Sequence, residues 1–189
     1  MADLTPDQRR RLYAFAQQLA ELADHQEDRW KVQSTEGRIL LTMTNPTAVD
    51  GLNAVRLRRQ IEAKAPGVVA LSDTHMGNPE TGLVKVPDLV VIAEDDIDDT
   101  ARVLNARIVL MAVEVVSPAH CLTDIRDYPR MGVPLYVVVD ARKDKQTVTV
   151  HSDPSPGPDG ISYRKAVPYA FGDTVTAGRW SLETSSLKS

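Results

Sequence analysis

Two acidic residues interrupt the most apolar segments of the chain. Asp88 opens the run DLVVIA directly after Pro87, and Glu114 stands inside the run IVLMAVEVVS. Burying a carboxylate in a central strand is costly unless the group is paired or coordinated. Two such residues on core strands therefore indicate a compensating cation. The alternative is that each carboxylate lies at a strand end, where it caps a helix or meets an arginine; taken alone, the two residues favour this alternative.

The strands that must position these acids are predicted from hydrophobic patterning. Three nearly continuous β-branched runs, over 88–93, 108–117 and 135–141, are typical of strands buried on both faces of a sheet. Shorter strands are predicted over 30–32, 38–43, 68–71 and 147–152, the first two joined by a turn at Glu36-Gly37.

Helices and loops fill the rest of the chain. A capping box at Thr5 starts a helix that runs to about residue 24, a second helix is predicted over about 47–65, and a short one over 123–131. Segments 73–83 and 153–160, rich in Gly, Pro, Asn and Asp, are predicted to be loops. Short strands and turns are expected from 161 onward, and residues 185–189 are expected to fray.

This order of elements predicts an α/β (α+β-like) protein with a mixed central sheet flanked by helices. The 189 residues fit a single domain over 1–189, with its core over about 28–152 and a β-rich C-terminal extension over about 161–182. The single cysteine, Cys121, excludes an intramolecular disulfide and suits a reducing compartment, so we expect a cytoplasmic protein. No apolar run reaches the roughly 18 residues that span a bilayer, so no membrane association is expected.

The overall charge argues against nucleic-acid binding over the whole protein surface. The net charge is −4, whereas phosphate binding usually requires a basic surface. Any contact with DNA therefore needs a local basic patch. The candidates are on the two long predicted helices: Arg9, Arg10 and Arg11 on the first, and Arg56, Arg58, Arg59 and Lys64 on the second. The alternative, which we favour, is that both groups are simply solvated helix faces.

The motifs around the two acids resemble the PD-(D/E)XK nuclease superfamily and, more narrowly, the bacterial Uma-two family of restriction-endonuclease-like proteins. The matching segments are VPDLVV at 86–91, VEVVSP at 113–118, and RDYPRMGVPLY at 126–136 running into Val139-Asp140. Tyr169, FGD at 171–173 and GRW at 178–180 fit the family's C-terminal pattern. With weaker matches at 31–32 and 37–39, the resemblance covers about 28–182.

This resemblance implies a restriction-endonuclease-like fold and metal-dependent hydrolysis of phosphodiesters in DNA. It implies Asp88 and Glu114 as catalytic residues that, with the backbone carbonyl of Val115, hold one Mg²⁺ or Mn²⁺ through oxygen atoms. Members of the family often associate as dimers, so the resemblance also implies a homodimer.

The sequence departs from the family pattern in its other polar positions. Val116 is not a lysine, and the segment that supplies the family's lysine is shortened and has none after Asp124. A family acid in the first hairpin is Gln33 here, and a histidine expected at the start of the second helix is absent. The candidates to replace the lysine are Lys85, Arg126 and Arg130. Two hypotheses follow: a metal-dependent endonuclease, weakly active or degenerate, or a catalytically inactive nuclease-fold module that binds nucleic acid or a protein partner.

Overall fold

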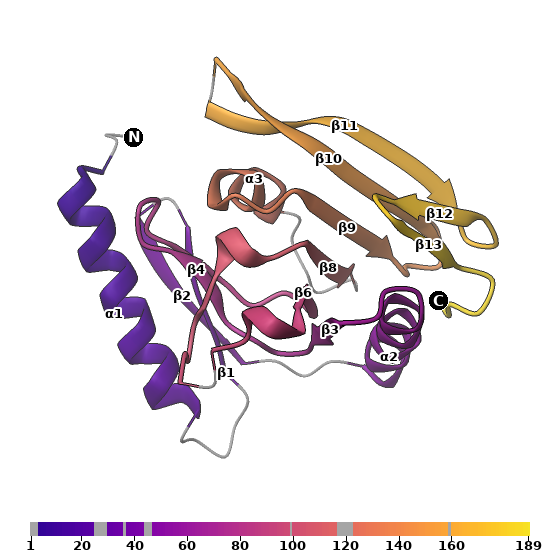
Figure 1. Cartoon of the computed structure of the whole chain (residues 1–189), viewed down its shortest axis with the longest axis horizontal. Helices are drawn as coiled ribbons and strands as arrows, with labels where there is room; N and C mark the ends of the chain where they lie inside the picture. Colours follow the sequence, from indigo (N-terminus) through magenta and orange to yellow (C-terminus); the bar gives the residue numbers. More distant parts are fainter. Residues whose placement is uncertain are drawn as a thin grey trace.

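The computed structural model describes residues 4–24, 30–35, 37–43, 47–98, 100–116, 123–158 and 160–189. Glu36 of the predicted first turn, Ser117 at the end of the predicted third buried strand, and Cys121 lie outside this part of the chain. Within it, two mixed sheets lie between helices, and the C-terminal part is rich in strands (Figure 1). The predicted class, a mixed sheet with flanking helices and a β-rich C-terminus, is therefore confirmed.

The larger sheet has six strands in the order β11-β10-β9-β8-β6-β3. Strands β8 and β9 run parallel and the other neighbours run antiparallel, which makes the sheet mixed. Its members are β3 (Val68–Leu71), β6 (Leu89–Ala93), β8 (Met111–Val116), β9 (Leu135–Asp140), β10 (Thr147–Gly157) and β11 (Gly160–Ala170).

The smaller sheet has five strands in the order β2-β1-β5-β4-β7. Helix α1 (Pro6–Asp24) covers one face of this sheet, where Ala16 and Ala20 pack against Val32. The capping box predicted at Thr5 is present, since Thr5 and Gln8 bond each other's backbone N–H. The strands are β1 (Trp30–Thr35), β2 (Arg38–Met43), β4 (Met76–Asn78), β5 (Leu83–Lys85) and β7 (Leu104–Asn105).

Helix α2 and a C-terminal hairpin pack on one face of the larger sheet, and a short helix and three 3₁₀ turns complete the described elements. These elements are helix α2 (Ala48–Ala63), the short helix α3 (Asp127–Met131), the 3₁₀ turns η1 (Glu94–Asp96), η2 (Ala106–Ile108) and η3 (Thr123–Arg126), and the hairpin of β12 (Thr174–Ala177) and β13 (Trp180–Glu183). None of the helices described combines the length and the apolar character that crossing a bilayer requires.

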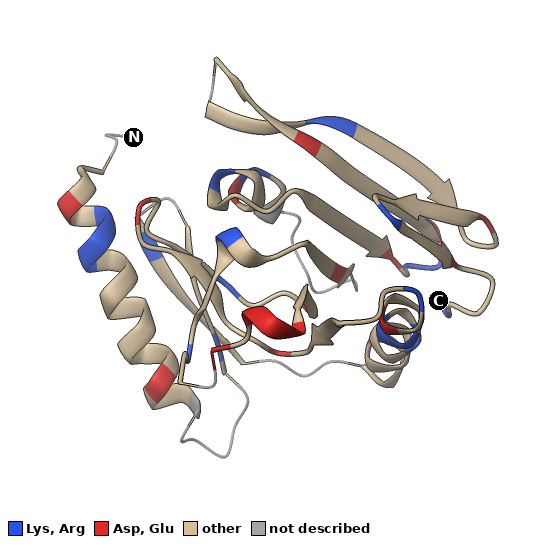
Figure 2. Cartoon of the chain, viewed as in Figure 1, with Lys and Arg blue, Asp and Glu red and all other residues tan. Residues whose placement is uncertain are grey.

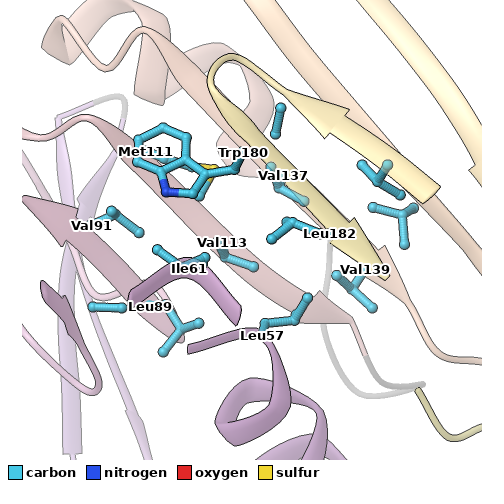
Figure 3. Close-up of a cluster of buried hydrophobic side chains, with 14 of the residues drawn as sticks. Leu57, Ile61, Leu89, Val91, Met111, Val113, Val137, Val139, Trp180 and Leu182 are labelled. Carbon is cyan, nitrogen blue, oxygen red and sulfur yellow. The ribbon is translucent and has the colours of Figure 1, made fainter. Parts of the chain in front are cut away.

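Side chains from β6 and β8 enter two different cores because they alternate along each strand. Leu89, Val91 and Val113 point to the side of α2 and the β12–β13 hairpin, where they meet Leu57, Trp180 and Leu182 (Figure 3). Val90, Ile92 and Ala112 point the other way and pack with Met76 and Leu83 of the smaller sheet. The larger sheet is thus buried on both faces, as its continuous apolar runs predicted.

Two segments predicted to be loops contain strands. Within 73–83, Met76–Asn78 forms β4, although Gly77 and Asn78 are residue types typical of turns. Gly77 is required there because a Cβ would lie 2.5 Å from the ring of Tyr13. The second segment, 153–160, continues β10 and starts β11, and the hairpin pairs as far as Gly157 and Gly160. Cross-strand pairing overrides local propensity in both places.

The C-terminal tail does not fray as predicted. Leu187 is buried against the core on the α2 side of the larger sheet. Fully buried Asn53 of α2 donates to the carbonyl of Lys188 at 2.8 Å and accepts from its N–H at 2.9 Å. The tail therefore covers part of the core on the α2 side of the larger sheet.

Because Asn53 makes both of these bonds, Asn53→Ala should lower the free energy of unfolding by about 1–3 kcal/mol. Removing residues 185–189 should lower it as well. The combined variant should lose clearly less unfolding free energy than the sum of the two single losses, since both changes break the same contact. Urea denaturation of the two variants and their combination measures this. Full additivity would show that the tail is not docked through Asn53.

Candidate metal centre

The structure brings Asp88 and Glu114 together between the two sheets. Strands β6 and β8 pair antiparallel with Leu89 opposite Val113, so Asp88, one residue earlier, stands opposite Glu114. Leu89 and Val113 pack on the α2 side. The two acids, which alternate with them, therefore point to the other face, toward the smaller sheet.

Backbone geometry fixes the first of these acids. The N–H of Val115 donates to Oδ2 of Asp88 at 2.7 Å. The N–H and C=O of one strand residue point to the same edge of the strand, so the Val115 carbonyl also faces the Asp88 side. Both carboxylates and this carbonyl are thus directed to one region.

A tyrosine hydroxyl holds the second acid. Glu114 is only 9 % exposed, and the Tyr128 hydroxyl donates to its Oε1 at 2.8 Å. Tyr128 comes from α3, which ends at Gly132 in the left-handed conformation (φ 98°) that favours glycine. Its ring packs against Tyr136 of β9 with 4.5 Å between centroids. The hydroxyl is therefore held in place by a rigid aromatic pair.

A third residue beside the two acids, not predicted from the sequence, is Lys31 of β1. Its Nζ lies 3.2 Å from Oδ1 of Asp88, and its side chain is 10 % exposed. Burial lowers the pKa of this ammonium, but the charges of Asp88, Glu114 and Asp73 and the hydrogen bond to Asp88 together raise it by more, so the pKa ends above its ordinary value. The signal that could have found Lys31 is its place in the first hairpin, two residues from Gln33 and on the same strand face.

Two of the three cations considered as replacements for the family's lysine contact Asp127. Lys85 is buried against Asp127, with 2.7 Å between Nζ and Oδ2. Asp127 also accepts from the Thr35 hydroxyl at 2.6 Å and lies 3.7 Å from Arg130. The side chain of Arg126 is exposed. Lys85 and Arg130 thus meet at Asp127, which tethers α3 to the smaller sheet.

The two predicted basic helix faces do not form one track. Figure 2 shows them at opposite ends of the molecule, on α1 and on α2. On α2, Arg56 donates to the carbonyl of Ser186 and Lys64 to that of Ser181, while Arg58 pairs with Glu62 at 3.0 Å. Arg56 and Lys64 thus help to anchor the C-terminal hairpin and tail.

The donor set suits a hard divalent cation with few protein ligands. Two carboxylates and one backbone carbonyl are oxygen ligands of the kind Mg²⁺ and Mn²⁺ take, with water completing the shell. Across the described part of the chain, no group of three or more His, Cys, Asp or Glu residues is placed to hold a metal. A site here would therefore rest on this pair.

The fold is a nuclease-like fold. A solved structure described as a putative nuclease belonging to DUF820, from Anabaena variabilis, has a TM-score of 0.65 and 17 % identity, covering 89 % of this chain and 96 % of that one. A family model described as "Putative restriction endonuclease", Uma2, matches residues 16–179. The chain belongs to this family. A search of curated proteins finds no match.

The hydrogen bond from the Tyr128 hydroxyl to the Glu114 carboxylate should contribute more to stability than a tyrosine hydrogen bond to a neutral carbonyl. Tyr128→Phe leaves the buried Glu114 short of a donor and should cost about 1.5–3 kcal/mol of unfolding free energy. The matched control is Tyr163→Phe, which removes a 2.8 Å bond to the Val133 carbonyl and should cost about 0.5–1.5 kcal/mol. Chemical denaturation compares them. A smaller effect at Tyr128 would argue against an ionised Glu114.

Proposed function

We propose that this protein is a divalent-metal-dependent nuclease that hydrolyses phosphodiester bonds in DNA. In this proposal Asp88 and Glu114, with the Val115 carbonyl, hold one Mg²⁺ or Mn²⁺. The observation that carries it is that Asp88, directly before β6, stands opposite Glu114 of β8 when the register of the two strands is continued by one residue, and that Asp88 accepts from the Val115 N–H. Membership of the Uma2 family supports it, since restriction-endonuclease-like families generally use a divalent ion.

The chain's own residues prepare this chemistry. When bound, the ion supplies Lewis-acid charge for the phosphate and lowers the pKa of a water. Asp88 is oriented by the Val115 N–H, and Glu114 is oriented by Tyr128. The ionised carboxylate is the form that binds a cation.

Contact with DNA has to be local, because the net charge is −4. Phosphate contacts through a small number of cations should give binding that weakens with salt. The homodimer and the cytoplasmic location expected from the sequence stay predictions beside this proposal.

The second candidate is a nuclease-fold module that binds nucleic acid or a protein without cleaving. Two observations favour it: an ammonium group already pairs with Asp88, and the family's hairpin acid is the neutral Gln33. This candidate predicts DNA binding that is indifferent to Mg²⁺ and survives loss of both acids. The nuclease predicts the reverse.

Plasmid nicking separates the two candidates. With Mg²⁺ or Mn²⁺ the wild-type chain should nick supercoiled DNA, and Asp88→Asn or Glu114→Gln should each lower the rate at least ~100-fold by removing a metal ligand. Asp153→Asn, an exposed acid on the β10–β11 hairpin, is the matched control and should retain the rate. Chelation with EDTA should stop the reaction.

Nicking that persists in both acid variants would place the activity elsewhere or in a contaminant. Salt-sensitive DNA binding without nicking in either metal would favour the binding module.

A further inference from the structure

We propose that Lys31 supplies the catalytic ammonium of this centre, orienting the attacking water and stabilising the negative charge that develops on the phosphate. The inference rests on the proposed function and adds to it a residue from the other sheet. It starts from one contact: Nζ of Lys31 lies 3.2 Å from Oδ1 of Asp88, in a side chain that is almost buried.

Strand β1 presents a polar face to the two acids. Val32 packs under α1 on one side of the strand, and Lys31, Gln33 and Thr35 alternate onto the other. Lys31 reaches Asp88 at one end of this face, and Thr35 reaches Asp127 at the other. This polar face of β1 thus lies beside the start of β6, where Asp88 stands.

The charge of Lys31 decides whether it can accept a proton from water or only donate hydrogen bonds. Its Nζ pairs with the Asp88 carboxylate at 3.2 Å, and a lysine in such an ion pair is an ammonium near neutral pH. An ammonium cannot take a proton from water. It donates hydrogen bonds and stabilises anionic charge, which is most effective in a partly desolvated site.

The reaction then balances without a further group. The oxygen of a water forms a bond to phosphorus while the bond from phosphorus to the leaving oxygen breaks. The water's proton passes to solvent, and the leaving oxygen takes a proton from solvent. Lys31 is unchanged at the end, having donated hydrogen bonds throughout.

A second buried lysine, Lys85, contacts the acid that opens α3. Lys85 pairs with Asp127 at 2.7 Å, in a cluster that also includes Thr35 and Arg130 and connects α3 to the smaller sheet. Loss of Lys85 should therefore act on folding, whereas loss of Lys31 should act on the chemical step.

The test separates metal binding from rate. In Lys31→Met, which keeps an unbranched apolar stem, the affinity for Mn²⁺ measured by calorimetry should stay equal or rise, because a positive charge beside the acids is removed. The plasmid-nicking rate at saturating Mn²⁺ should nevertheless fall at least ~100-fold. Lys165→Met, at an exposed lysine of the β10–β11 hairpin, is the control and should change neither quantity.

Chemical rescue excludes a merely structural role. Methylamine or ethylamine should restore part of the rate of Lys31→Ala and leave Glu114→Gln inactive. Lys31→Arg, which keeps a charge and donors, should retain more rate than Lys31→Met; this comparison still applies if the methionine variant folds poorly, which thermal unfolding reveals.

Lys31→Met nicking at the wild-type rate in saturating Mn²⁺ would overturn this inference and leave the proposed function standing. Absence of any metal-dependent nicking by the wild-type chain would overturn both.

Discussion

Two like charges held side by side between the sheets are the constraint on which this molecule depends. Asp88 and Glu114 stand opposite each other on antiparallel strands, and Glu114 is almost fully buried. Such a pair is strongly unfavourable unless donors or a cation compensate it. The structure supplies the Val115 N–H, the Tyr128 hydroxyl and the Lys31 ammonium. These three donors come from β8, α3 and β1, so both sheets and one helix contribute to compensating the pair.

The layered architecture follows from that requirement. The larger sheet carries the acids on one face and packs its other face against α2 and the C-terminal hairpin. The smaller sheet brings Lys31 to the first face, and α1 covers its outer side. The ion pair of Lys85 with Asp127 joins the smaller sheet to α3, which positions Tyr128. The site takes its acids from one sheet and its lysine from the other, so it depends on how the two sheets are placed relative to each other.

The sequence predicted the two acids and their strands because a carboxylate inside a β-branched run stands out from its neighbours. It also predicted both long helices, whose capping boxes at Thr5 and Thr47 are local features. It missed β4 because a three-residue strand containing Gly77 has no periodicity and is specified by a packing contact with Tyr13. Lys31 was missed for a related reason: a lysine in a short strand is ordinarily exposed, and its partner lies 57 positions away in the chain.

The central claim is that the two acids share a divalent ion, and locating Mn²⁺ in crystals tests it most directly. Our account predicts an anomalous-scattering peak within about 2.0–2.6 Å of carboxylate oxygens of both Asp88 and Glu114. It also predicts that this peak disappears in Glu114→Gln crystals soaked in the same way. Mn²⁺ bound elsewhere, with Lys31 still paired to Asp88 and no peak between the acids at saturating metal, would contradict it.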